Sequence, residues 1–194
     1  MNTAVAPRRI VEVDGATVEV FSLPTDEASL FELMRDVFEN HWHEIVFGPL
    51  IQGAAWELRA PGAPEKITMF DGYLTVAFGV PHFHICIGEH KGPHNNPVSP
   101  VLAQHRRTAR AELYRRLSSH DAKPVSWGLR LFNGQDEQQI TVLLPNPFLE
   151  PDTDKVLRQP DWSRLALWDK LRARWLGLDE PDPFDRAGTG FRHH

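Results

Sequence analysis

Three histidines, a carboxylate and the only cysteine of the chain stand close together in residues 82–90. His82, His84 and Cys86 alternate with apolar residues, and this period of two predicts a β-strand with all three polar side chains on one face. Residues two apart on a strand lie about 6.6 Å apart, so the imidazoles of His82 and His84 could bind one metal ion. The segment therefore predicts a metal site or an acid–base site.

Other histidines and carboxylates could complete a metal shell. Glu89, His90 and His94 follow in the loop after the strand, and a second His-x-His pair, His41 and His43, precedes it. Two histidines and a carboxylate suit non-haem iron, three histidines with a water suit zinc, and histidines alone suit copper. Haem on a proximal histidine is a further alternative. We expect the metal ligands among His41, His82, His84, His90 and His94.

The same region allows chemistry without a metal. His43, Glu44 and Glu89 are the predicted proton-transfer residues, with His84 as their alternative partner. Cys86 could be a nucleophile if His84 on the same face made it a thiolate. A lone cysteine between two isoleucines is more typical of a small buried apolar residue.

Five arginines between positions 106 and 116 fall in a segment that we expect to be a helix over 101–117. Guanidinium groups bind carboxylates and phosphates bidentately. Arg106 and Arg110 directly follow the histidine loop, so they are candidates for binding an anionic substrate or cofactor. The alternative is a solvated helix face that pairs with nearby acids.

Hydrophobic periodicity and turn residues predict an α+β fold, a mainly antiparallel sheet with three packed helices. A thioredoxin-like core from about 80 to 145 is the alternative. We expect one domain over 1–176 and a mobile tail over 177–194. The predicted helices are 26–40, 101–117 and 161–176. The predicted strands are 10–13, 17–21, 54–59, 66–70, 73–78, 82–87, 125–132 and 138–144.

Composition excludes several classes of function. The net charge of −5 disfavours nucleic acid, and no apolar run is long enough to span a membrane. There is no phosphate-binding loop and no dinucleotide fingerprint. One cysteine excludes an internal disulfide and favours the cytoplasm. The expected partner is a small-molecule substrate, and a Trp-rich C-terminal helix leaves a homo-oligomer open.

Three motifs carry a family resemblance. Residues 82–92 (HFHICIGEHKG), 126–130 (SWGLR) and 144–148 (LPNPF) resemble a bacterial family of uncharacterised proteins with an HFHxCIGxHxG motif. The resemblance covers roughly 40–149 and implies no particular activity. The His82–His84 pair with Glu89 also resembles part of the first cupin motif, but Val76 replaces its glycine. The order of elements from 82 to 144 is similar to thioredoxin-fold ferredoxins, whose cluster-binding cysteines are absent.

These observations favour a metal-dependent enzyme that acts on a small organic molecule, as a hydrolase, lyase or oxygenase. The expected cofactor is iron, zinc or copper. The alternatives are a non-catalytic haem- or metal-binding protein and a metal-free enzyme that uses His and Glu for proton transfer.

Overall fold

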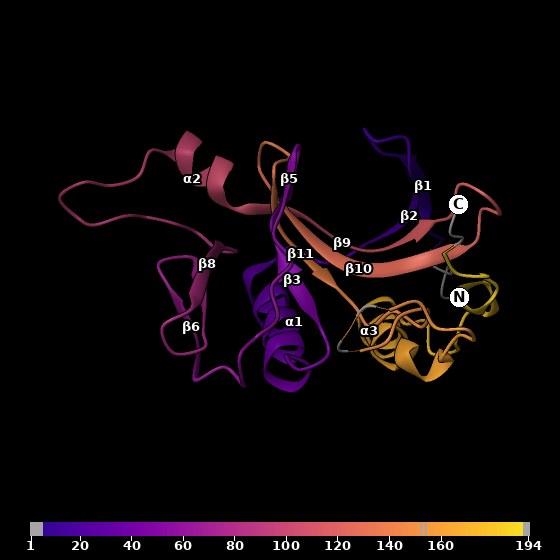
Figure 1. Cartoon of the computed structure of the whole chain (residues 1–194). Helices are drawn as coiled ribbons and strands as arrows, with labels where there is room; N and C mark the ends of the chain where they lie inside the picture. The colour runs from indigo at the N-terminus through magenta and orange to yellow at the C-terminus, as the bar shows by residue number, and fades with distance from the viewer. Residues whose placement is uncertain (1–5, 152, 154, 192–194) are drawn as a thin grey trace. The chain divides into compact units, whose positions relative to one another are not determined.

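The computed structural model describes residues 6–151, 153 and 155–191, and Figure 1 follows the chain through its elements. Within these residues there are three α-helices, α1 (Glu27–Asn40), α2 (Pro100–Arg106) and α3 (Ala166–Leu176). Two 3₁₀ turns accompany them, η1 (Trp162–Leu165) and η2 (Pro183–Arg186). The strands are β1 (Arg8–Val11), β2 (Thr17–Ser22), β3 (Val46–Gly48), β4 (Leu50–Ile51), β5 (Ala54–Ala55), β6 (Lys66–Phe70), β7 (Tyr73–Ala77), β8 (His82–Cys86), β9 (Thr108–Leu117), β10 (Pro124–Asn133) and β11 (Gln138–Leu143).

The described strands form three sheets. The largest has the order β1-β2-β9-β10-β11-β3, and β6-β7-β8 and β4-β5 form the other two. Strand pairs β1–β2, β2–β9, β6–β7 and β7–β8 are antiparallel. The predicted α+β class with three helices is confirmed, whereas the thioredoxin-like alternative is not.

The chain divides into two compact units, and β9 and β10 give residues to both. The first unit comprises Met1–Leu23, Glu112–Leu129 and Leu143–His194. Its core contains Trp127 and Trp168, which are almost completely buried. The ring of Phe21 meets Trp168 edge to face, with 5.9 Å between centroids. Packing of β2 against α3 thus stabilises this unit.

The second unit comprises Pro24–Ala111 and Arg130–Val142. Helix α1 begins where the Asp26 carboxylate accepts a hydrogen bond from the Ser29 amide, which satisfies a free donor of the first turn. The buried face of α1 ends in Phe38, whose ring contacts Phe47, Phe78 and Phe83. This aromatic cluster holds α1, β3 and β8 together.

The predicted helix over 101–117 is wrong beyond its first two turns. Helix α2 ends at Arg106, and β9 begins at Thr108 between β2 and β10. Alanine, arginine and glutamate favour helices as isolated residues. Pairing with a strand on each side overrides that preference, because Leu113 and Arg115 are buried in β9.

Most predicted strands and turns agree with the structure. The tight turn at Asp71 and Gly72 joins β6 to β7, and both residues have positive φ, 45° and 79°, as a type I′ hairpin requires. The predicted strand over 54–59 is shorter than expected. Only β5 and an isolated bridge between Phe47 and Leu58 form there.

The predicted single domain with a mobile tail is not tested by a static structure and stays a prediction. In the described part of the tail, η2 is present and the Asp185 side chain is completely buried. Residues 192–194 lie outside the described residues. Among the described helices none is both long and apolar enough to cross a bilayer.

Candidate histidine site

Strand β8 presents its histidines as the alternating sequence pattern predicts. His84 lies opposite Thr75 of β7, and His82 lies opposite Ala77. Both histidines are exposed, whereas Ile85 is buried. Successive side chains of a strand point to opposite faces, so β8 directs its imidazoles to the solvent face of the three-stranded sheet.

The two imidazoles lie against each other. Their ring centroids are 5.2 Å apart in an edge-to-face arrangement. His82 Nδ1 lies 2.9 Å from the Val80 carbonyl oxygen. A carbonyl only accepts, so Nδ1 carries the hydrogen and the neutral ring keeps its lone pair on Nε2. His84 Nδ1 lies 2.7 Å from the Thr75 hydroxyl, which fixes the second ring.

A largely apolar cavity of about 520 Å³ borders this strand, and we call it the β8 cavity. Its lining comes from four parts of the second unit: β3 and Pro49; Leu58, Arg59 and Pro61; Phe78 and residues 81–85; and Gln139 with Ile140 of β11. Among the described residues that line it, every ionisable side chain is basic, namely Arg59, His82 and His84. The β8 cavity therefore combines an apolar interior with basic side chains in its lining.

The earlier histidine pair occupies a turn after α1. His41 caps the helix, and its Nδ1 lies at hydrogen-bond distance, 2.5 Å, from the Glu44 carboxylate. His43 is exposed, and its ring meets Trp42 edge to face at 5.6 Å. None of these residues lines the β8 cavity.

His90 lies in a different polar cluster. Its Nε2 atom is 3.4 Å from Asp71, and its Nδ1 atom is 3.2 Å from Arg106 Nη1. The backbone amides of Lys91 and Gly92 donate to the same aspartate. The hydrogen bond from the Lys91 amide is the main cause that holds the pKa of Asp71 below its ordinary value. Burial acts in the opposite direction, and the Gly92 amide lowers the pKa further. Asp71 thereby anchors the loop after β8.

The remaining predicted site residues stand apart from the β8 cavity. His94 is exposed, and Glu89 pairs with Lys91 at 3.4 Å. Arg110 pairs with Asp136 and lies over the ring of Phe132. Among the described residues, no group of three or more histidine, cysteine, aspartate or glutamate side chains has the spacing of a metal shell. Of the predicted ligands, the structure brings His82 and His84 together.

Cys86 is a buried free thiol. It is 3 % exposed, and its Sγ atom donates to the Gly88 carbonyl at 3.6 Å. Burial raises the pKa of the Cys86 thiol, although Arg106 and Arg107 act in the opposite direction. These features are typical of a small apolar core residue rather than a nucleophile.

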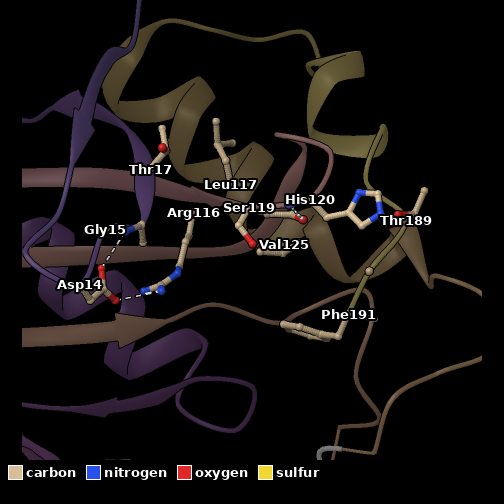
Figure 2. Close-up of a pocket in the computed structure, with 13 residues that line it drawn as sticks. Asp14, Gly15, Thr17, Arg116, Leu117, Ser119, His120, Val125, Thr189 and Phe191 are labelled. Atoms are coloured by element: carbon tan, nitrogen blue, oxygen red, sulfur yellow. Dashed lines mark hydrogen bonds and ion pairs between the residues drawn. The ribbon is translucent and has the colours of Figure 1, made fainter. Parts of the chain in front are cut away.

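A second cavity, of about 700 Å³, lies in the first unit, and none of the predicted site residues lines it. We call it the hydroxyl cavity, because Thr17, Ser118, Ser119 and Thr189 line it. Figure 2 shows the Asp14 carboxylate turned toward the guanidinium group of Arg116, and the two are 2.9 Å apart.

The segments that line the hydroxyl cavity are far apart in the sequence. They are residues 14–17, 116–120, 125 and 189–191. Ser118, Ser119 and His120 are adjacent polar residues, which is the one local signal that could have indicated this place. The Ala16 amide and then Arg116 hold the pKa of Asp14 below its ordinary value, so this carboxylate stays ionised near neutral pH.

Comparison with known proteins gives a family but no described relative. No curated protein and no solved structure matches the chain. A family model does match residues 7–177, which is most of the chain. The chain belongs to a protein family described as "Family of unknown function (DUF7676)".

Proposed function

We propose that this protein binds a small organic molecule with an apolar body in the β8 cavity. One observation carries the proposal: the cavity is mostly apolar and is bordered by the two exposed histidines that the sequence pattern singled out. Sites for small molecules are concave and mostly apolar, with a few polar groups that fix orientation. His82, His84 and Arg59 are those groups here.

The apolar part of the ligand would contact Phe47 and Phe83 at one wall and Ile140 at another. The rings of Phe47 and Phe83 are 5.6 Å apart and belong to the core cluster that contains Phe38. The cavity wall is therefore supported by the core of the second unit, and a preformed site costs little reorganisation on binding.

Fluorescence of 8-anilino-1-naphthalenesulfonate, an apolar anion, tests this proposal directly. Leu58→Asp places a carboxylate on the cavity wall and should weaken binding at least tenfold. Ile51→Asp is the matched control, because Ile51 and Leu58 are each 51 % exposed and only Leu58 lines the cavity. Equal affinity of the two variants, or no binding to the wild type, would refute the proposal.

A metal-dependent enzyme is the second candidate, and the His82–His84 geometry favours it. The Val80 carbonyl accepts a hydrogen bond from His82 Nδ1, so the Nε2 atom is available to bind a metal. Histidine ligands in metal sites are commonly oriented by such a hydrogen bond from their other ring nitrogen. Two imidazoles would supply two ligands, with water or substrate at the open positions. Such an ion would activate water or polarise a carbonyl of the molecule in the cavity.

Equilibrium dialysis against zinc alone tests the second candidate. One equivalent of zinc should bind to the wild type and to the control variant His105→Ala. His105 is a suitable control because it lies against Glu137 and not beside His82 and His84. His84→Ala should lose the zinc. Retention of zinc by His84→Ala, or no zinc in the wild type, would exclude this pair as the metal site.

A further inference from the structure

The edge of β8 has a hydrogen-bonding pattern that follows from its register with β7. In antiparallel strands, residues that exchange both hydrogen bonds with the partner alternate with residues whose backbone groups point away. The Phe78 amide donates to the Pro81 carbonyl, and the Ile87 amide donates to the Gly72 carbonyl. Together with the register of β7 and β8, these bonds show that the backbone N–H and C=O groups of Phe83 and Ile85 point toward β7. The N–H and C=O groups of His82 and His84 therefore point outward.

Cys86 supports this assignment. The same alternation directs its carbonyl outward, and that oxygen accepts hydrogen bonds from Thr108 Oγ1 at 3.1 Å and Gln139 Nε2 at 3.4 Å. Strand β8 ends its sheet and pairs with β7 alone, and among the described residues no backbone group of another strand pairs with His82 or His84. The outward edge of β8 is thus covered at Cys86, and at the two histidines no second strand pairs with it, so we call it the open edge.

This open edge borders the β8 cavity. Five consecutive residues, 81–85, line it. Consecutive side chains point to opposite faces of a sheet, so a run of five can border one cavity only along the edge of the strand. Backbone N–H and C=O groups of His82 and His84 are therefore within the ligand's reach.

We propose that the ligand of the β8 cavity is an N-acylated apolar amino acid or a short peptide that ends in one, with a free carboxylate. This inference rests on the function proposed above and names its ligand class. The last ligand residue would pair with His84 as an added strand residue does. The His84 carbonyl accepts from the ligand amide, and the His84 N–H donates to the ligand carboxylate.

Charge and shape support the same ligand. The carboxylate would meet a lining whose described ionisable groups, Arg59, His82 and His84, are all basic, and such complementarity favours an anion. The apolar side chain of the ligand would enter the space beside Phe47 and Phe83. An apolar carboxylic acid without an amide would interact with the basic side chains and the apolar interior, but it could not donate a hydrogen bond to the His84 carbonyl.

Ligand chemistry provides the first test. N-acetyl-L-leucine is the minimal probe, and in N-acetyl-N-methyl-L-leucine a methyl group replaces the hydrogen of its one N–H group. By isothermal titration calorimetry we expect the first to bind at least tenfold more tightly than the second. N-acetyl-L-leucinamide, which lacks the negative charge, should also bind at least tenfold more weakly. Equal affinities of the two acids would overturn the proposal.

Two variants of His84 provide the second test. His84→Ala and His84→Pro both remove the imidazole, but only proline removes the N–H group. This N–H points away from β7, so proline at this edge position leaves the ladder intact. N-acetyl-L-leucine should bind His84→Pro at least tenfold more weakly than His84→Ala, provided that circular dichroism shows both are folded. If His84→Pro does not fold, the N-methyl probe decides the matter alone.

The outcomes separate this inference from the proposed function. If the naphthalenesulfonate binds in a Leu58-dependent way while the amide N–H adds nothing, the cavity binds ligands and edge pairing is wrong. If neither the naphthalenesulfonate nor N-acetyl-L-leucine binds, both proposals fail. Tenfold discrimination by the amide N–H, lost in His84→Pro, supports both.

Discussion

Arg115 and Asp185 form a buried ion pair in the first unit, with 2.8 Å between Nη1 and Oδ1. Their side chains are 5 % and 0 % exposed. Asp185 also accepts hydrogen bonds from the indole N–H groups of Trp127 and Trp168. A single carboxylate from the C-terminal segment thus accepts hydrogen bonds from side chains of β9, β10 and α3. These bonds anchor η2 to the core of this unit.

Removal of Arg115 should destabilise the protein strongly. Arg115→Ala leaves the buried Asp185 carboxylate with only the more distant Arg172, at 4.0 Å, and breaking a buried pair in this way costs about 3–5 kcal/mol. Arg116→Ala is the matched control, because this neighbouring arginine is 44 % exposed and pairs with Asp14. Exposed pairs contribute at most about 1 kcal/mol. Urea unfolding measures both free energies, and equal values would show that the buried pair is not what stabilises the unit.

Acid should weaken the same cluster. Burial raises the pKa of Glu19 and Asp182, but their hydrogen bonds, those from Arg115 among them, outweigh it, so each pKa lies below its ordinary value. A carboxyl group whose pKa is lower in the folded state than in the unfolded state stabilises the protein at pH values above its unfolded-state pKa. This stabilisation is lost as the pH falls through its folded-state pKa. The free energy of unfolding should therefore fall below about pH 5.

Arg115→Ala is the control for this pH dependence. Without the guanidinium, the pKa values of Glu19 and Asp182 should move back up, since Arg115 lies 2.8 and 2.7 Å from them. Urea unfolding between pH 6 and pH 3 should then give a shallower slope than in the wild type. An unchanged slope would mean that other carboxyl groups cause the acid sensitivity.

The sequence predicts β8 well because alternation is a local signal. Leu74 and Val76 of the neighbouring strand are completely buried, so a one-residue slip would expose the core face, and the register is fixed. The segment after Arg106 fails for the opposite reason. Its residue types favour a helix, but its structure is decided by pairing with β10, the next strand, and with β2, which lies far away in the sequence.

The site was predicted only in part, for similar reasons. His82 and His84 are two residues apart, so strand geometry alone brings them together. The position of His90 depends on Asp71, nineteen residues earlier, and on Arg106 after a long loop. The cavity wall opposite β8 comes from β3 and β11. No local pattern could indicate that these strands border the histidines.

Two glycines in hairpin turns should respond differently to alanine. Gly15 and Gly72 each follow an aspartate and have φ of 81° and 79°. A Cβ atom on Gly15 meets nothing within 4 Å, whereas one on Gly72 would lie 2.6 Å from the Glu89 carbonyl. We expect Gly15→Ala to cost about 1 kcal/mol from backbone strain and Gly72→Ala about 3 kcal/mol, because the overlap adds to it.

Urea unfolding of the two glycine variants measures this difference. Both substitutions remove the same backbone freedom from the unfolded chain, so the comparison isolates the contact with Glu89. Similar losses in the two variants would show that the loop after β8 yields easily at Glu89. A larger loss in Gly72→Ala would show that close packing of the β6–β7 turn holds that loop in place.

Cys86 should be unreactive in the folded protein. The thiolate is the reactive form, and burial raises the pKa of the Cys86 thiol, so the thiolate fraction near neutral pH is below that of an ordinary cysteine. The side chain is also only 3 % exposed. Reaction with 5,5′-dithiobis(2-nitrobenzoic acid) should be slow in buffer and stoichiometric in denaturing urea.

Cys86→Ser should still bind N-acetyl-L-leucine with near wild-type affinity, because Cys86 does not line the β8 cavity. Rapid labelling of the folded protein would instead restore Cys86 as a candidate nucleophile.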